Sequence, residues 1–174
     1  MKKIALIGTH GTGKTTLAHE LVAALKKRDI NAEFLGEIAR TCPLPINENT
    51  SKEAQEWIIY TQYAKELEYI NRCDILVCDR SVLDSYAYYM NKCGENKLLE
   101  DFVKEKIVDY SFLFRVPINP SYLKEDGIRS VNQSFQKNID EKVKFILDKL
   151  SVNYYTESNA DKILEVLLND RRAI

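Results

Sequence analysis

The chain has 174 residues, enough for one α/β domain with its own core and too few for two comfortable ones. Apolar residues make up 45% and charged residues 29%, the balance of a soluble globular protein. The formal charge of −1 argues against a dedicated binder of nucleic acid or of an anionic membrane surface.

The N-terminus and the cysteines indicate the compartment in which the protein works. The apolar run Ile4–Ile7 is too short for the core of a signal peptide, and no apolar stretch approaches the length of a membrane span. The four cysteines form no C-x-x-C pair, and the chain has only two histidines, so neither a zinc site nor a disulfide framework is suggested. We therefore expect a cytoplasmic protein with reduced thiols and no membrane association.

In the first half of the chain, strand and helix patterns alternate. Ile4–Ile7 suits a strand buried on both faces, and apolar residues then recur at helical spacing over 14–28. Residues 31–35 predict a second strand, and 36–49, which contains two prolines, predicts an irregular loop. A long helix is expected over 51–72.

The second half continues this alternation. A strand is predicted at 75–78, and helices follow at 82–92 and 97–108. The remaining predicted elements are a strand at 111–114, a helix striped by Phe135, Ile139, Val143, Ile146 and Leu150, a strand at 152–155, and a helix striped by Ile163, Leu164, Leu167 and Leu168. The alternation predicts a single α/β domain over 1–174, with a parallel sheet covered on both faces by right-handed crossovers.

A glycine-rich segment separates the first strand from the first helix. Residues 8–15 read Gly-Thr-His-Gly-Thr-Gly-Lys-Thr and match G-x-x-x-x-G-K-[ST] at every fixed position. Glycines let successive backbone N–H groups turn inward around a phosphate, and the helix that follows adds its positive end. Lys14 is expected to reach the β- and γ-phosphates of ATP, and the Thr15 hydroxyl to bind Mg²⁺. The predicted nucleotide-binding set is Gly8, Thr9, His10, Gly11, Thr12, Gly13, Lys14, Thr15 and Thr16.

Charged residues follow the second and third predicted strands, where ligands of such sheets collect. Asp79 ends the third strand and is expected to bind Mg²⁺ or act on the acceptor, although an aspartate there also suits a helix N-cap. Arg80 is a candidate for neutralising the transferred phosphoryl group, or else a surface ion pair. Glu37 is a candidate general base, or else a loop acid paired with Arg40.

A polar segment at about 117–130 separates the fourth strand from the next helix. Because phosphoryl transfer must exclude water, a loop that closes and brings in a cation would serve it. Arg129 is the candidate catalytic arginine of this short lid; a solvent-facing loop is the alternative.

The motifs together resemble the nucleoside and nucleotide kinases among the P-loop proteins. Asp79-Arg80-Ser81-Val82, followed by Asp84-Ser85-Tyr86-Ala87-Tyr88, is similar to segments of deoxynucleoside and thymidylate kinases. Glu37 sits where deoxynucleoside kinases place their base glutamate, and Gln62-Tyr63-Ala64 resembles their base-reading stretch. The substrate-binding set that the resemblance implies is Glu37, Arg40, Gln62, Arg80, Asp84 and Tyr88.

Two further segments are similar to a narrower group. Glu37-Ile38-Ala39-Arg40 and Asp126-Gly127-Ile128-Arg129 resemble the ribosylnicotinamide kinase domain of NadR proteins and the AAA-type ATPases related to it. The resemblance implies a three-layer P-loop NTPase fold, with a five-stranded parallel sheet in the order 2-3-1-4-5. It places adenine near Asn159 and Asp161, and it allows a homodimer.

The predicted function is Mg²⁺-dependent transfer of the γ-phosphoryl group of ATP to a nucleoside-like small molecule, such as ribosylnicotinamide or a deoxynucleoside. Either Glu37 or Asp79 would act as the base. A nucleoside monophosphate acceptor is an alternative, and it would make Arg40 and Arg115 more important. The motifs are also compatible with a regulatory ATPase that has no small-molecule acceptor and with a 5′-end polynucleotide kinase, although the near-neutral charge weakens the latter.

Overall fold

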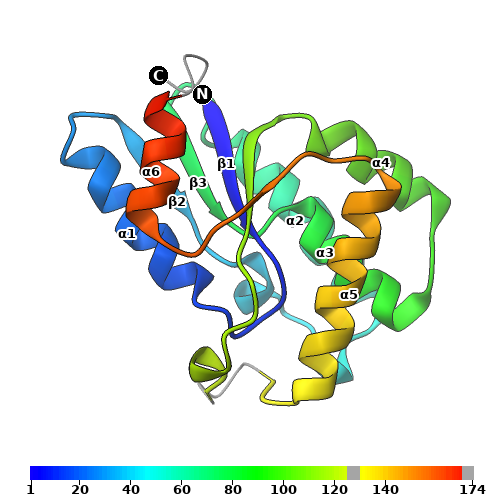
Figure 1. The fold of residues 1–174 in the computed structure, drawn as a ribbon. Coiled ribbons are helices and arrows are strands. Elements are labelled where there is room, and N and C mark those ends of the chain that lie inside the picture. Colours follow the sequence, from blue (N-terminus) through cyan, green and yellow to red (C-terminus); the bar gives the residue numbers. More distant parts are fainter. Residues whose placement is uncertain (125–129, 170–174) are drawn as a thin grey trace.

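The computed structural model describes residues 1–124 and 130–169. Its strands form one parallel sheet in the order β2-β3-β1-β4-β5 (Figure 1), the order that the resemblance implies. The strands are β1 (Lys2–Ile7), β2 (Ala32–Leu35), β3 (Ile75–Asp79), β4 (Tyr110–Arg115) and β5 (Tyr155–Thr156).

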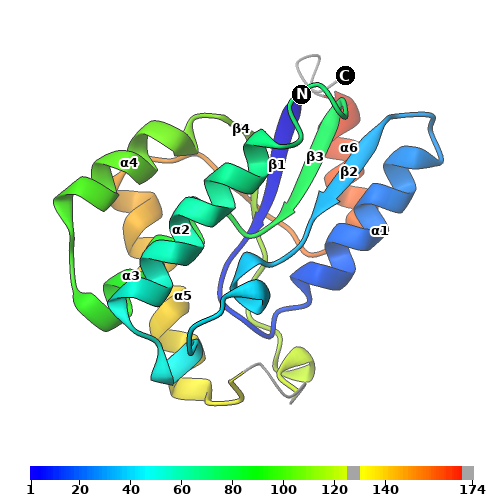
Figure 2. The same cartoon turned by 180° about the vertical axis from the view of Figure 1, so that it is seen from behind.

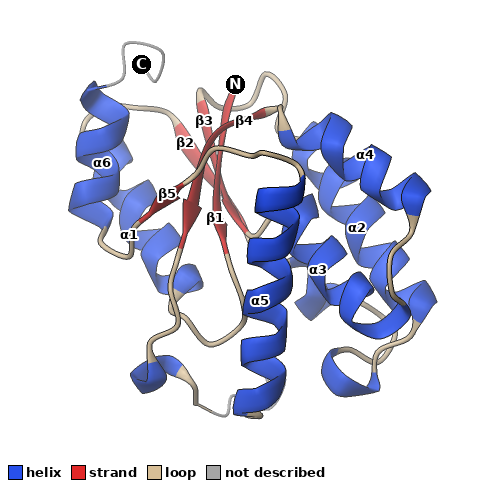
Figure 3. Cartoon of the chain, turned by 45° about the vertical axis from the view of Figure 1, so that its right-hand side comes forward, coloured by secondary structure: helices blue, strands red, loops and turns tan. Residues whose placement is uncertain are grey.

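Helices cover both faces of this sheet, which makes the fold three-layered (Figure 3). The helices are α1 (Lys14–Lys26), α2 (Lys52–Leu67), α3 (Val82–Cys93), α4 (Lys97–Ile107), α5 (Gln133–Lys149) and α6 (Ala160–Asn169). Helices α1 and α6 pack on one face, and α2 to α5 lie on the other, as the view from behind shows (Figure 2). Among the described residues, none of these helices is both long and apolar enough to span a bilayer.

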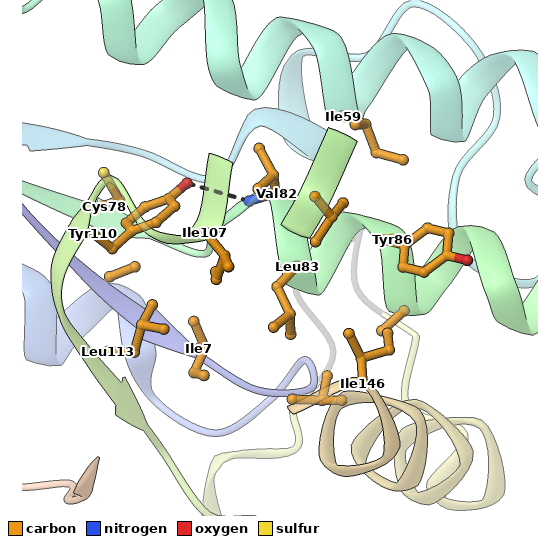
Figure 4. Packing of buried hydrophobic residues seen from close by; sticks show 14 of the residues in the cluster. Ile7, Ile59, Cys78, Val82, Leu83, Tyr86, Ile107, Tyr110, Leu113 and Ile146 are labelled. Atoms are coloured by element: carbon orange, nitrogen blue, oxygen red, sulfur yellow. Dashed lines mark hydrogen bonds between the residues drawn. The ribbon is translucent and has the colours of Figure 1, made fainter. Parts of the chain in front are cut away.

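Residues on neighbouring positions of a strand enter different layers of the core, because side chains alternate across a sheet. On β1, Ile4 and Leu6 pack with α1 and α6, whereas Ala5 and Ile7 pack with α2, α3 and α5. Figure 4 shows Ile7 on the face of the sheet that α2, α3 and α5 cover, near Leu83 and Leu113. This burial on both faces explains why β1 reads as a continuous apolar run.

Most element bounds differ from the predicted ones by one or two residues, and two elements depart further. Helix α2 ends at Leu67 rather than 72, because the chain then tightens into turns in which Tyr69 N–H donates to Glu66. Strand β5 begins at Tyr155 rather than 152, because Val152 N–H bonds back to Leu147 and closes the end of α5. The loop 36–49 contains two 3-10 turns, Ile38–Thr41 and Asn47–Asn49, and a third, Pro120–Tyr122, lies after β4.

Candidate nucleotide and acceptor site

A pocket opens where the segments after β1, β2 and β3 meet at the carboxyl edge of the sheet. Its walls come from the glycine-rich loop, the turn after β2, the first turns of α2 and the junction of β3 with α3. The lining residues are His10, Gly11, Thr12, Gly13, Lys14, Thr15, Glu37, Ala39, Arg40, Ile46, Asn47, Gln55, Ile58, Asp79, Arg80, Ser85 and Tyr88. The predicted catalytic and phosphate-binding groups thus largely share one concave site, the usual form of a small-molecule site.

The glycine-rich loop has the backbone conformation that its composition predicts. Gly8, Gly11 and Gly13 have φ angles of 130°, 62° and 88°, where side chains other than glycine are strained. A Cβ on Gly8 would also lie 2.9 Å from the carbonyl oxygen of Val116. Gly13 immediately precedes α1, so the backbone amides of the loop lie beside the positive N-terminal end of that helix.

Lys14 is buried inside the curve of the loop. Its ammonium donates to the carbonyl oxygen of Thr9 and, at 3.0 Å, to the hydroxyl of Thr12. Burial, together with the charge of Arg80, lowers the pKa of Lys14 to about 8. A phosphate anion beside this ammonium would stabilise its charged form and give it stronger acceptors than a carbonyl.

Thr15 and Asp79 form the candidate magnesium site. The hydroxyl of Thr15 donates to Oδ2 of Asp79 over 2.5 Å, so two hard oxygen ligands already lie side by side. Burial, and then the charge of Glu37, raise the pKa of Asp79. Mg²⁺ typically takes one or two protein oxygens plus water and phosphate oxygens, so this pair fits it.

Glu37 lies between two arginines, in the wall formed by the turn after β2. Its Oε1 accepts from Arg80 Nε over 2.6 Å, and its Oε2 accepts from Arg40 Nε over 3.2 Å. Burial by itself would raise the pKa of Glu37, but the charges of Arg80 and Lys14 hold it at about 2. Glu37 is therefore a charged carboxylate that lines the pocket while paired with Arg40 and Arg80, and its role as a general base stays a prediction.

Arg80 connects the acidic side of the site to the glycine-rich loop. Its Nη1 donates to the carbonyl oxygen of Gly8 over 3.1 Å, and its guanidinium lies over the ring of Tyr88. The φ angle of Arg80 is 87°, a left-handed conformation that a side chain of this size rarely adopts. Strain of this kind concentrates at functional sites and marks Arg80 as a residue whose position matters.

Asp84, predicted to bind substrate, lies outside the lining of this pocket. Its fully buried carboxylate accepts from the N–H of Gly8 over 2.6 Å and from both the N–H and the hydroxyl of Ser81 over 2.8 Å. Ser81 in turn caps α3 in a capping box. Asp84 therefore ties the start of the glycine-rich loop to the start of α3.

This role predicts a loss of stability on substitution. The variant Asp84→Asn would place an amide N–H₂ against one of these donors, so we expect it to lower the free energy of unfolding by about 2 kcal/mol. Urea denaturation followed by circular dichroism measures this. Asp101→Asn, at an exposed position of α4, is the matched control and should leave the midpoint in place. Equal midpoints for Asp84→Asn and the wild-type protein would contradict the role.

Gln62, predicted to read a base, is not brought to the pocket. Its amide donates to Glu66 over 2.8 Å, inside a buried polar cluster in which Lys3 and Tyr110 also bind Glu66. Figure 4 shows the hydroxyl of Tyr110 beside Val82, whose N–H it accepts over 3.3 Å. The glutamine of α2 that lines the pocket is Gln55, two turns earlier.

Thr16, predicted as part of the nucleotide-binding loop, and Asn159 and Asp161, predicted near adenine, lie outside the lining of this pocket. Thr16 lines a second groove together with Thr12, Gly13, Tyr122 and Ser158. Asn159 instead caps α6, since its Oδ1 accepts the N–H of Lys162, and Asp161 is exposed in the first turn of that helix. Arg129 lies outside the described residues, as do residues 125–128 of the predicted lid.

Two glutamines at the site, Gln55 and Gln136, were not predicted from the sequence. Gln136 is 3% exposed and lies against the glycine-rich loop. A signal for both was present: in a right-handed β-α-β crossover the helix runs back against the strands, so its first turns lie at their carboxyl ends. Polar residues near the start of α2 and α5 were therefore better candidates than Gln62.

Comparison with known proteins agrees with this geometry. A family model described as an AAA domain matches residues 3–161. No protein with a curated description matches the sequence. Among solved structures, deoxyadenosine kinase from M. mycoides, with the products dCMP and a flexible dCDP bound, has a TM-score of 0.63. The two chains are 14% identical over 99% of this chain and 100% of the other, so the likeness is one of fold. The chain belongs to the AAA domain family and has the three-layer fold of the P-loop kinases.

Proposed function

We propose that this protein is a kinase that transfers the γ-phosphoryl group of ATP to a hydroxyl group of a nucleoside-like small molecule. The observation that carries this proposal is the ion pair of Glu37 with Arg80, 2.6 Å long, in the same pocket as the glycine-rich loop. A site that only binds a nucleotide needs the loop and Lys14. An acid and a strained arginine facing that loop suit a second substrate that gives up a proton.

Each group has a role in this reaction. Backbone amides of the glycine-rich loop and the Lys14 ammonium would bind the β- and γ-phosphates and hold them in place. Arg80 would neutralise charge on the transferred group, and Glu37 would accept a hydrogen bond from the attacking hydroxyl. Thr15 and Asp79 would hold Mg²⁺, which supplies positive charge to the phosphate oxygens.

The low pKa of Glu37 is compatible with a role in accepting the hydroxyl proton. With a pKa of about 2, Glu37 is fully charged at neutral pH but is a weak base while Arg80 and Lys14 lie near it. The negative charge of a bound triphosphate would compete for both cations, and this would make Glu37 more basic when the donor is present. The demand on the base is modest, because the transition state of phosphoryl transfer is largely dissociative.

The part of the pocket lined by Ala39, Ile46, Gln55 and Ile58 favours an unphosphorylated nucleoside over a nucleoside monophosphate. Ala39, Ile46 and Ile58 provide an apolar surface, and Gln55 provides a polar contact for a base. Arg115, which a monophosphate acceptor would have made important, is buried and donates to both carboxylate oxygens of Asp140 at 2.8 Å. Arg115 also lies outside the lining of the pocket.

A transfer assay tests the proposal. The protein is incubated with γ-labelled ATP, Mg²⁺ and a panel of nucleosides (ribosylnicotinamide included), nucleoside monophosphates and 5′-hydroxyl oligonucleotides. We expect label on a nucleoside, at its hydroxyl. Label on a monophosphate or an oligonucleotide would replace the proposed acceptor class. Free phosphate alone, released at a rate that no acceptor changes, would instead support a regulatory ATPase.

A further inference from the structure

The first turn of α5 holds the glycine-rich loop from outside the pocket. The side-chain amide of Gln136 donates to the carbonyl oxygen of His10 over 2.8 Å and to that of Gly11 over 3.4 Å. The main-chain carbonyl of Gln136 accepts from the hydroxyl of Thr9 over 2.9 Å. A Cβ on Gly11 would lie 3.2 Å from the Gln136 nitrogen, so the amide is in close contact with the loop.

These contacts fix the direction of two peptide groups. In a planar trans peptide the C=O of one residue and the N–H of the next point in opposite directions. Because Gln136 holds the carbonyls of His10 and Gly11 toward α5, the N–H groups of Gly11 and Thr12 point away from α5, and both residues line the pocket. Two inward N–H groups in succession are what an anion-binding nest requires.

The preceding peptide is held in the opposite sense by other groups. The carbonyl oxygen of Thr9 accepts from Lys14, and the N–H of His10 donates to the hydroxyl of Tyr88 over 3.2 Å. The ring of Phe135, next to Gln136, also packs against His10 at a centroid distance of 5.3 Å. The reversal between the 9–10 and 10–11 peptides is therefore set by side chains around the loop.

The loop needs such support because of its composition. Glycine adopts positive and negative φ angles with similar ease, so a loop that is free to wrap a phosphate is also free to turn its peptides outward. We propose that Gln136 is a positioning residue that keeps the amides of Gly11 and Thr12 directed at the phosphates. This inference rests on the proposed function in one respect: it takes the loop to be the phosphate site.

Gln136→Glu tests this, because it keeps the shape of the side chain while removing both donors and placing a negative charge against two carbonyls. We expect its Kd for Mg²⁺–ADP, measured by isothermal titration calorimetry, to rise about 10-fold or more. The KM for ATP should rise in parallel, while the KM for the acceptor stays unchanged. A residue that only stabilised the fold would not separate the two KM values. Gln133→Glu makes the same change at an exposed position one turn earlier and should keep the wild-type Kd.

The variants also separate failure of this inference from failure of the proposed function. A folded Gln136→Glu protein that binds ADP as the wild type does would overturn the inference, even if acceptors are phosphorylated. Weakened ADP binding in a protein that labels no acceptor would support the inference while the kinase proposal fails. If Gln136→Glu does not fold, Gln136→Met, which lacks the donors and the charge, carries the same test. Loss of folding in both variants would assign Gln136 to stability alone and overturn the inference.

Discussion

Replacement of Lys14 by alanine is expected to lower the kcat of phosphoryl transfer by about 10³-fold, the effect of losing a preorganised positive donor at a developing charge. The ammonium of Lys14 lies within the curve of the loop, where its present partners are the Thr9 carbonyl and the Thr12 hydroxyl. Both are neutral acceptors, so the charge of Lys14 is not needed to satisfy them. We therefore expect the fold to persist, and stopped assays with γ-labelled ATP to show the loss.

The control for this variant is Lys26→Ala at the other end of α1. Lys26 is exposed and forms an ion pair with Glu33 on β2, far from the loop. An exposed pair contributes little to stability, so this variant should retain wild-type kinetics. Transfer by Lys14→Ala at a rate near that of Lys26→Ala would show that the loop does not act on the transferred group.

Glu37→Gln is expected to reduce kcat by about 10²- to 10³-fold while leaving the Kd for ATP little changed, which is the range for loss of a general base. The amide cannot accept the hydroxyl proton, yet it keeps the size of the side chain. It also loses the charge that pairs with Arg80, so Arg80 should be freer to approach a phosphate. Transfer rates at saturating ATP and acceptor, beside a calorimetric titration with ATP analogue, separate the two effects.

A matched change on the preceding strand controls for the loss of one carboxylate. Glu33→Gln on β2 removes the acid that pairs with Lys26 at the surface and should leave kcat unchanged. A normal kcat for Glu37→Gln would exclude Glu37 as the base and leave Asp79 as the other carboxylate that lines the pocket. A raised Kd for ATP with unchanged kcat would instead make Glu37 a residue that shapes the nucleotide site.

The sequence was sufficient to predict those features that are encoded locally. Strand β1, the glycine-rich loop and α1 follow one another without interruption, so an apolar run, a fixed motif and a helical spacing identify all three. The two candidate magnesium ligands were each identified from a local pattern, the motif threonine and an aspartate at the end of a buried strand. Thr15 and Asp79 are 64 residues apart, and they meet because β1 and β3 are neighbours in the sheet.

Features that depend on distant residues could not be read in this way. Asp84 resembles a substrate ligand in sequence, but its partner Gly8 lies 76 residues earlier, and only the packing of α3 beside the loop brings them together. Strand order depends likewise on pairing between β1, β3 and β4, which periodicity does not encode and which only the resemblance implied.

There is a geometric reason why Gln55 lines the pocket and the predicted Gln62 does not. The two residues lie on the same face of α2, and two helical turns separate them by about 10 Å along the axis. Gln62 lies near Lys3, at the amino end of β1, whereas Gln55 lies at the carboxyl edge of the sheet. Sequence similarity to a short stretch identified the helix and its face but not the turn.

Calorimetric titration of the wild-type protein with a non-hydrolysable ATP analogue and Mg²⁺ tests most directly whether residues 8–15 bind a polyphosphate. We expect a one-to-one complex that adenosine, lacking phosphates, does not form at the same concentrations, and that weakens when Mg²⁺ is withheld. A protein that does not bind the analogue, or that binds adenosine equally well, would contradict the assignment of this loop as a phosphate site.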